Sequence, residues 1–348
     1  MADTWKLYTL EDAFKPRPPA EYAVANLIRL PSLGMFYGPP GCLKSMLLAD
    51  MAVCISGGID WLQPAAWQPG SKPRTVLPCP VLWLDLDNGK DTTEDRFKAL
   101  ATGHKVDPGA ALFYYTMPSP WPRLIDEAQA NELKDRIFLT QARVVIIDNL
   151  ARVSAGVDEN TRQMDDVMNN LRQISEATRT AIILIHHSSK DRGTGGRAGD
   201  RLRGHSSIEA ALDLAISVER EEYSSKINLI TTKSRHGEIP PFAAEWTYKK
   251  EADDTLIEGA FYGLAADDDK SDHALDRVIL SSVDGTWTNK TNLRKLVKEE
   301  LPDIGNHRIE SRISFLAAAG KLAEKPGNIT NEKLYRHPSS GVFQSSSG

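Results

Sequence analysis

The stretch FYGPPGCLKSMLLADMA, residues 36–52, constrains the fold more than any other part of the sequence. It follows the phosphate-loop pattern G-x-x-x-x-G-K-[ST], with Gly38, Lys44 and Ser45 in place. In such a loop, backbone N–H groups and a helix N-terminus surround a phosphate group, the lysine adds positive charge and the hydroxyl binds Mg²⁺. The loop needs a strand before it and a helix after it, so it predicts an α/β protein.

Leu43 departs from the pattern, because a glycine usually stands there. Its Cβ atom resists a positive φ angle by roughly 1 kcal/mol or more. The position contributes only its backbone N–H to a phosphate, so we expect a working site with a strained loop. The residues expected to bind the nucleotide are Gly38, Pro39, Pro40, Gly41, Cys42, Leu43, Lys44, Ser45 and Met46.

Near-continuous runs of Val, Ile and Leu predict strands buried on both faces, as in a parallel sheet covered by helices. These runs lie at residues 33–37, 80–88, 143–149 and 180–190. After residue 212, four further runs with short turns predict an antiparallel meander. The predicted fold is therefore α/β, with a mostly parallel sheet extended by the meander. Residues 57–80, rich in Gly and Pro, predict a surface insertion.

Shifts in composition divide the chain into two domains and three shorter segments. We predict an N-terminal arm at 1–30, a main domain at 31–264, a linker at 265–272, a small domain at 273–337 and a low-complexity tail at 338–348.

The small domain has three predicted helices followed by a hairpin, which is the order of a winged helix. The helices are expected at 273–283, 289–300 and 306–319. Residues 270–337 hold 12 Lys and Arg against 9 Asp and Glu, in a chain whose net charge is −5. A mildly basic DNA-binding appendage fits this asymmetry, and a small helical oligomerisation domain is the alternative.

Acidic residues end two of the predicted strands. Asp148 ends VVIID, where an acid can hold Mg²⁺ together with Ser45. Asp85 and Asp87, in LDLDN, are expected on one side of a strand by alternation, and either could polarise an attacking water. A single acid at a strand end is usually just solvated, but the three features together indicate nucleotide hydrolysis.

Histidine and basic residues come next along the chain, at the ends of further predicted strands and in the segment between them. His186 and His187 are either a hydrogen-bonded surface pair or a sensor of the γ-phosphate. Lys233 and Arg235, at the tip of a predicted hairpin, form either an ordinary basic turn or a finger that reaches a neighbour's γ-phosphate. The Gly-rich segment after the histidines suits a phosphodiester backbone, or is a solvated disordered loop. Its cationic residues are Lys190, Arg192, Arg197, Arg201 and Arg203.

Taken in this order, the features resemble the RecA-like hexameric ATPases, most of all the plasmid replicative helicases of the RepA type, over roughly residues 20–250. The resemblance implies a RecA-like domain whose mobile loop, about 188–206, faces DNA. It departs at Leu43 and at Asp87, where the family usually has Glu. The catalytic residues it implies are Lys44, Asp87, Asp148, His187, Lys233 and Arg235, with Ser45 and Asp148 at the metal.

The sequence therefore predicts an ATP- and Mg²⁺-dependent DNA helicase that acts as a homo-oligomeric ring, with a hexamer favoured. Single-stranded DNA is expected at the central loop and duplex DNA at the small domain. The alternatives are a DNA-binding regulatory ATPase that unwinds nothing and an ATPase unrelated to DNA. No apolar run has the length of a membrane span, and three cysteines without a C-x-x-C pair fit a reducing cytoplasm.

Overall fold

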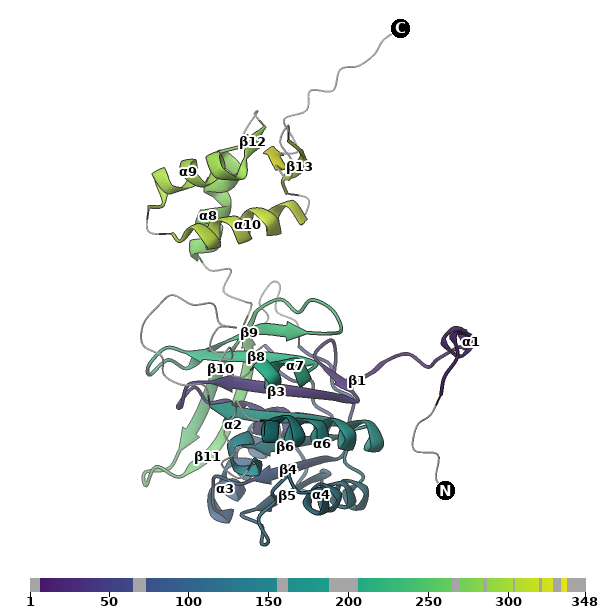
Figure 1. Cartoon of the computed structure of the whole chain (residues 1–348). Helices are drawn as coiled ribbons and strands as arrows, with labels where there is room; N and C mark the ends of the chain where they lie inside the picture. The colour runs from purple at the N-terminus through teal and green to yellow at the C-terminus, as the bar shows by residue number, and fades with distance from the viewer. Residues whose placement is uncertain are drawn as a thin grey trace. The chain divides into compact units, whose positions relative to one another are not determined.

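The computed structural model forms two compact units, Met1–Ala265 and Ala266–Gly348 (Figure 1). The structure describes residues 7–64, 73–154, 162–187, 206–264, 270–283, 287–302, 304–318, 321–327 and 333–336.

The first unit is built on a sheet that has nine strands within the described residues, in the order β11-β10-β9-β8-β3-β7-β6-β4-β5. Strands β3 to β8 pair in parallel, and β9, β10 and β11 add an antiparallel meander. The predicted α/β fold class is confirmed. The strands are β3 (Ser32–Gly38), β4 (Val81–Asp85), β5 (Leu112–Thr116), β6 (Val144–Asp148), β7 (Ala181–His187), β8 (Leu214–Arg220), β9 (Lys226–Ser234), β10 (Phe242–Lys250) and β11 (Leu256–Leu264).

Helices cover both faces of this sheet, because alternate strand residues enter two different cores. Phe36 and Ile146 pack with helices α2 and α3, whereas Met35 and Ile147 pack with α4 and α6. The helices of the unit are α1 (Leu10–Phe14), α2 (Lys44–Gly57), α3 (Lys90–His104), α4 (Glu127–Thr140), α5 (Leu150–Val153), α6 (Arg162–Thr178) and α7 (Ser206–Ala211).

The register of the parallel strands defines two edges of the sheet. At the carboxyl edge, Gly38 of β3 pairs with His187 of β7, and Asp85 of β4 pairs with Asp148 of β6. At the opposite edge β3 and β8 begin, and the antiparallel β9 ends there, with Ser234 paired to Leu214. The phosphate loop therefore lies at one edge and the residues after β9 lie at the other.

Two sequence predictions are wrong for this unit. Residues 1–30 are not simply an arm, because β1 (Glu21–Val24) and β2 (Ile28–Leu30) form a hairpin whose apolar side chains enter the core. The segment 57–80 is not a surface insertion throughout, because Trp61 is fully buried and pairs with Arg74 by backbone hydrogen bonds. Both segments carry apolar side chains whose burial in the core stabilises the fold, which an exposed arm or loop would forgo.

The second unit packs three helices on a small sheet of order β12-β14-β13 in its described residues. Its core includes Leu275, Leu293, Ile313 and Tyr335. Helix α8 begins at Lys270, inside the linker predicted at 265–272. The elements are α8 (Lys270–Ser281), β12 (Thr288–Asn289), α9 (Lys290–Glu300), α10 (Asn306–Ala318), β13 (Ala323–Pro326) and β14 (Lys333–Arg336).

Within the described part of the chain, no helix combines the length and the apolar character that crossing a membrane requires.

Candidate active site

The phosphate loop connects the end of β3 to the start of α2, as the sequence predicts. A Cβ atom at Gly38 would lie 2.3 Å from the carbonyl oxygen of Val218, so only glycine fits between β3 and β8. Gly41 has a φ of +81°. Leu43, at the N-cap of α2, makes no side-chain capping hydrogen bond. The first amide groups of α2 therefore receive no acceptor from that side chain, which suits an anion.

The expected backbone strain at Leu43 is present. Its φ is 65° and its ψ is 20°, in the left-handed region that disfavours a residue with a Cβ. Its side chain is half-buried against the core under α2. Packing of this side chain therefore offsets part of the cost of the backbone conformation.

Lys44 lies inside the loop. Its Nζ donates hydrogen bonds of 2.9 Å to the carbonyl oxygens of Gly38 and Pro39 and lies 3.5 Å from Cys42 Sγ. Burial lowers the pKa of Lys44, and the negative charge of Asp148 acts in the opposite direction. The amine is held where a phosphate group in the loop could take the place of its carbonyl partners.

Ser45 and Asp148 are brought together, as the sequence predicts for a metal site. The pKa of Asp148 is raised to about 6: burial raises it most, a hydrogen bond from Ser45 lowers it, and the charges of Asp85 and Asp87 raise it. Asp148 Oδ2 is buried and has no hydrogen-bond partner among the described residues. A buried carboxylate oxygen without a partner, next to a hydroxyl and other acids, fits a hard cation such as Mg²⁺.

Asp85 and Asp87 do not share one side of a strand, because β4 ends at Asp85. The buried Asp85 carboxylate instead accepts hydrogen bonds from the Asn88 amide at 2.7 Å and the Thr93 hydroxyl at 2.8 Å, and so shapes the loop. Asp87 is turned toward the site: Asn149 Nδ2 and Arg152 Nε each donate to it at 3.0 Å. Of the two acids, Asp87 is therefore the one placed to meet a water.

His187 lies beside the phosphate loop because β7 pairs with β3. Burial lowers the pKa of His187, the charge of Lys44 lowers it further, and the charge of Asp87 raises it. The imidazole is therefore neutral at pH 7, and it lies within electrostatic range of two predicted catalytic residues. The structure thus gathers Lys44, Ser45, Asp87, Asp148 and His187 at one edge of the sheet.

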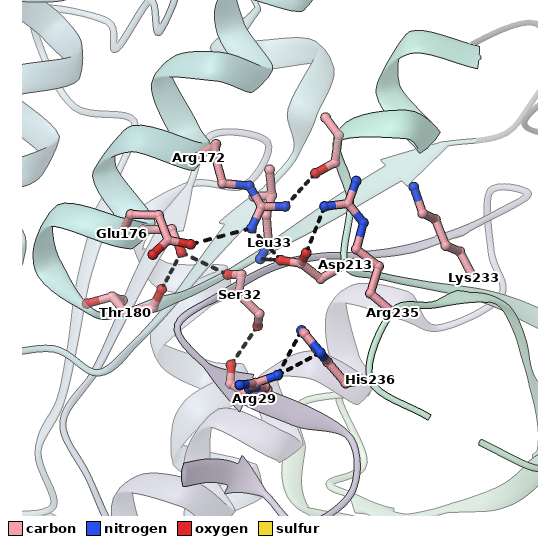
Figure 2. Close-up of polar contacts among 12 residues, drawn as sticks. Arg29, Ser32, Leu33, Arg172, Glu176, Thr180, Asp213, Lys233, Arg235 and His236 are labelled. Atoms are coloured by element: carbon pink, nitrogen blue, oxygen red, sulfur yellow. Dashed lines mark hydrogen bonds and ion pairs between the residues drawn. The ribbon is translucent and has the colours of Figure 1, made fainter. Parts of the chain in front are cut away.

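Lys233 and Arg235 lie at the other edge, where Arg235 contacts the buried carboxylate of Asp213 (Figure 2). Lys233 Nζ donates to the carbonyl oxygens of Glu209 and Ala210, and Arg235 Nη2 donates to Ala210 at 2.6 Å. Arg235 Nη1 is 3.4 Å from Asp213, which Arg172 contacts at 2.5 Å. In this chain the predicted finger is therefore separated from the phosphate loop.

The residues predicted to bind DNA lie outside the described residues. They are Lys190, Arg192, Arg197, Arg201 and Arg203.

Three polar residues of the site were not predicted from the sequence. Asn149 and Arg152 hold Asp87, and Arg220 Nη1 donates to the Gly41 carbonyl at 3.0 Å. Asn149 directly follows Asp148, which was an available signal. Arg220 had none, because its contact depends on the pairing of β8 with β3.

The chain was compared with known proteins. A family model described as an AAA domain matches residues 3–193, which is more than half of the chain. The chain belongs to the AAA domain family.

This AAA domain is also similar to a solved structure of a DnaB-like replicative helicase studied with primase, at 14% identity and a TM-score of 0.47. That match covers 64% of this chain and 56% of the helicase chain, so the chain spans little more than half the helicase's length. The structure of the RadB recombinase matches at 14% identity and a TM-score of 0.44, over 62% of this chain and 87% of the recombinase.

Leu43→Gly in this AAA domain is expected to keep nucleotide affinity within about threefold of the wild type. The position offers a phosphate only its backbone N–H, and glycine accepts a positive φ without strain. Titration with a fluorescent ATP analogue measures the affinity, and Lys44→Ala is the control that should lose it. Loss of binding by folded Leu43→Gly would show that the leucine side chain, and not the backbone alone, forms the loop.

Asp148→Asn tests the metal site through pH. Since the pKa of Asp148 is about 6, wild-type affinity for nucleotide with Mg²⁺ should fall about tenfold from pH 7.5 to pH 5, as the acid protonates. Asp148→Asn should bind weakly at both pH values. The exposed Asp135→Asn is the control for a lost carboxylate, and it should follow the wild type.

The same substitution has a predicted effect on stability. The folded state binds the proton of Asp148 more tightly than the unfolded chain does, so this stabilisation is present below pH 4 and is lost as the pH rises through 6. Asp148→Asn should therefore raise the free energy of unfolding at pH 8 by on the order of 2 kcal/mol. A lower stability of the variant at pH 8, measured by urea unfolding, would contradict the assignment.

Proposed function

We propose that the protein is an ATP-hydrolysing, DNA-associated motor of RecA-like type, and specifically a plasmid- or phage-type replicative helicase that acts as a ring. One observation carries the proposal. The basic finger of Lys233 and Arg235 lies at the opposite sheet edge from the phosphate loop of its own chain.

The separation is set by the central strand. The seven residues of β3 span roughly 20 Å at the usual rise per residue. A lysine or arginine side chain cannot cross that length and the sheet between. If the finger stabilises transition-state charge on a γ-phosphate, it does so on another copy, as arginine fingers supplied in trans do.

The residues at the phosphate edge have separate roles in this proposal. Lys44 and the loop amides bind the phosphate chain, and Ser45 and Asp148 hold Mg²⁺, which neutralises charge on the phosphate oxygens when bound. Asp87, oriented by Asn149 and Arg152, positions the attacking water and accepts its proton. The neutral imidazole of His187 lies beside the phosphate loop and would sense the charge of the γ-phosphate.

The chain between β7 and α7 supports the DNA part of the proposal. It begins after His187, beside the phosphate loop, and ends before Ser206, the first residue of α7. Five basic residues between 188 and 205 give it a charge suited to a phosphodiester backbone. The segment thus joins the nucleotide edge to the finger edge.

Exposed apolar side chains near the N-terminus support the proposed homo-oligomer, for which the family resemblance favours a hexamer. Leu7 is 91% exposed, Leu10 is 77% and Phe14 is 81%. Residues 15–20 include three prolines, which make an extended, semi-rigid spacer. A second copy of the chain is the occupant that would bury these side chains.

For the second unit we propose a winged-helix domain that binds duplex DNA. The order of helix, short strand, two helices and hairpin supports this assignment. Lys325 and Arg336 lie over the ring of Trp287, at 4.4 and 4.9 Å from its centroid, and give the hairpin a basic surface. A helical oligomerisation domain is the alternative.

A second function is favoured by the environment of Asp87. Both of its oxygens accept hydrogen bonds from Asn149 and Arg152, and its side chain is shorter than the Glu of the resembled helicases. A carboxylate whose two oxygens already accept hydrogen bonds is a weaker base toward water, so the protein would hydrolyse ATP slowly. This favours a regulatory DNA-binding ATPase that does not unwind duplexes.

The rate of ATP hydrolysis with and without single-stranded DNA tests the proposal. We expect stimulation of about tenfold or more by single-stranded DNA, and none in Lys44→Ala, which lacks the charge at the phosphates. A fluorescent strand-displacement assay then separates a helicase from the regulatory ATPase. Hydrolysis that single-stranded DNA leaves unchanged would contradict both DNA-linked functions.

A mixing experiment tests the finger. Arg235→Ala should bind ATP normally and hydrolyse it at least roughly 100-fold more slowly, because it lacks transition-state charge. Mixed with Lys44→Ala, which keeps a sound finger, it should regain activity at shared interfaces. If fluorescence energy transfer shows that subunits exchange and no activity returns, the finger does not act in trans.

A further inference from the structure

A cavity of about 490 Å³ lies at the finger edge of the sheet, away from the phosphate loop. The β1–β2 hairpin, the starts of β3 and β8, and the connection from β9 to β10 line it. Its volume is within the range of small-molecule sites. The residues with charged or imidazole side chains that line it are Arg29, Arg74, Asp213, His236 and Glu238.

Arg29 faces this cavity without a carboxylate partner among the described residues. Its Nη1 lies 2.7 Å from His236 Nδ1 (Figure 2). A guanidinium only donates hydrogen bonds, so the imidazole must accept, and it is neutral when it does so. Burial lowers the pKa of His236, and the charge of Arg29 lowers it further. The positive charge of Arg29 is therefore not neutralised by its partner.

Arg74 is the second cation of the cavity. Its guanidinium carbon lies 4.0 Å from the centroid of the Phe242 ring, and the side chain has no ion pair or hydrogen bond in the described part of the chain. Burial lowers the pKa of Arg74. A half-buried guanidinium stacked on a ring and lacking an anion is costly for the protein unless a ligand supplies one.

The acids of the cavity do not balance these charges. Asp213 already accepts hydrogen bonds from the Leu33 amide at 2.8 Å and from Arg172 at 2.5 Å. Glu238 is exposed and forms no ion pair within the described residues. Two guanidinium groups without a carboxylate partner among the described residues, and a neutral imidazole, thus face one space.

We propose that this cavity binds a small phosphorylated molecule, at a site separate from the phosphate loop. Guanidinium groups match the oxygens of a phosphate in paired, charge-assisted hydrogen bonds. A phosphate offers acceptors in several directions, so Arg29 and Arg74 can donate to it from different walls. The site needs neither DNA nor hydrolysis, and so goes beyond the function proposed above.

The test uses the full-length Lys44→Ala protein, in which the phosphate loop is disabled. Calorimetric titration with pyrophosphate, at fixed ionic strength, should give saturable binding. Arg29→Gln and Arg74→Gln in that background should each weaken it about tenfold or more, since each removes a charge-assisted partner. The exposed Arg123→Gln is the matched control and should leave binding unchanged. Equal binding by all variants, or none by Lys44→Ala itself, would overturn the proposal.

Two further measurements complete the test. The first does not depend on whether the arginine variants fold, and the second identifies the source of the phosphate. With labelled histidines in the Lys44→Ala protein, pyrophosphate should shift the ring signals of His236 and not those of the distant, buried His104. No shift at His236 would overturn the proposal. Inorganic phosphate that binds as tightly as adenosine monophosphate indicates a free phosphate ligand, and tighter binding of the monophosphate indicates a nucleotide.

Discussion

The parallel pairing of β3 with β7 on one side and β8 on the other determines what both edges of the sheet can do. At the carboxyl edge it sets Gly38 beside His187, and leaves room for the phosphate loop only because Gly38 has no Cβ to meet the carbonyl of Val218. At the opposite edge it brings Asp213 to the Leu33 amide. The length of β3 keeps the two edges apart, so one chain holds its phosphate loop and the basic pair Lys233 and Arg235 in separate places.

Much of the fold follows from local sequence. The apolar runs at β3, β6 and β7 are buried on both faces, so their composition alone distinguishes them from loops and amphipathic helices. The phosphate loop is equally local, because its glycines and Lys44 act within one turn of chain. Where partners come from elsewhere, prediction fails. Residues 21–30 lack a long apolar run, and their hairpin is stabilised by burying Val24 and Ile28 under distant elements.

The candidate site shows the same division. Ser45 and Asp148 were predictable as partners. Ser45 lies in the helix that follows β3 and Asp148 ends β6, and the apolar runs of the sequence already place both strands in one parallel sheet. The predicted geometry of Asp87 is wrong, because side-chain alternation assumes that β4 continues to residue 87. The strand ends at Asp85, whose carboxylate accepts a hydrogen bond from the Asn88 amide and so stabilises a turn. Arg220 contacts Gly41 across 179 positions of sequence. Such a contact depends on strand order, which no local pattern contains.

Helix α7 has a part in the molecule that its length does not suggest. Its carbonyl groups at Glu209 and Ala210 accept the hydrogen bonds of Lys233 and Arg235, so the position of α7 sets the position of both basic side chains. The chain that enters α7 leaves β7 at His187, beside the phosphate loop. Arg172 holds the other end of this arrangement, by contacts to Asp213 and to the Ala211 carbonyl. A displacement of α7 would therefore have to break contacts to three cationic side chains, Arg172, Lys233 and Arg235, so the place of this short helix and the places of these side chains depend on one another.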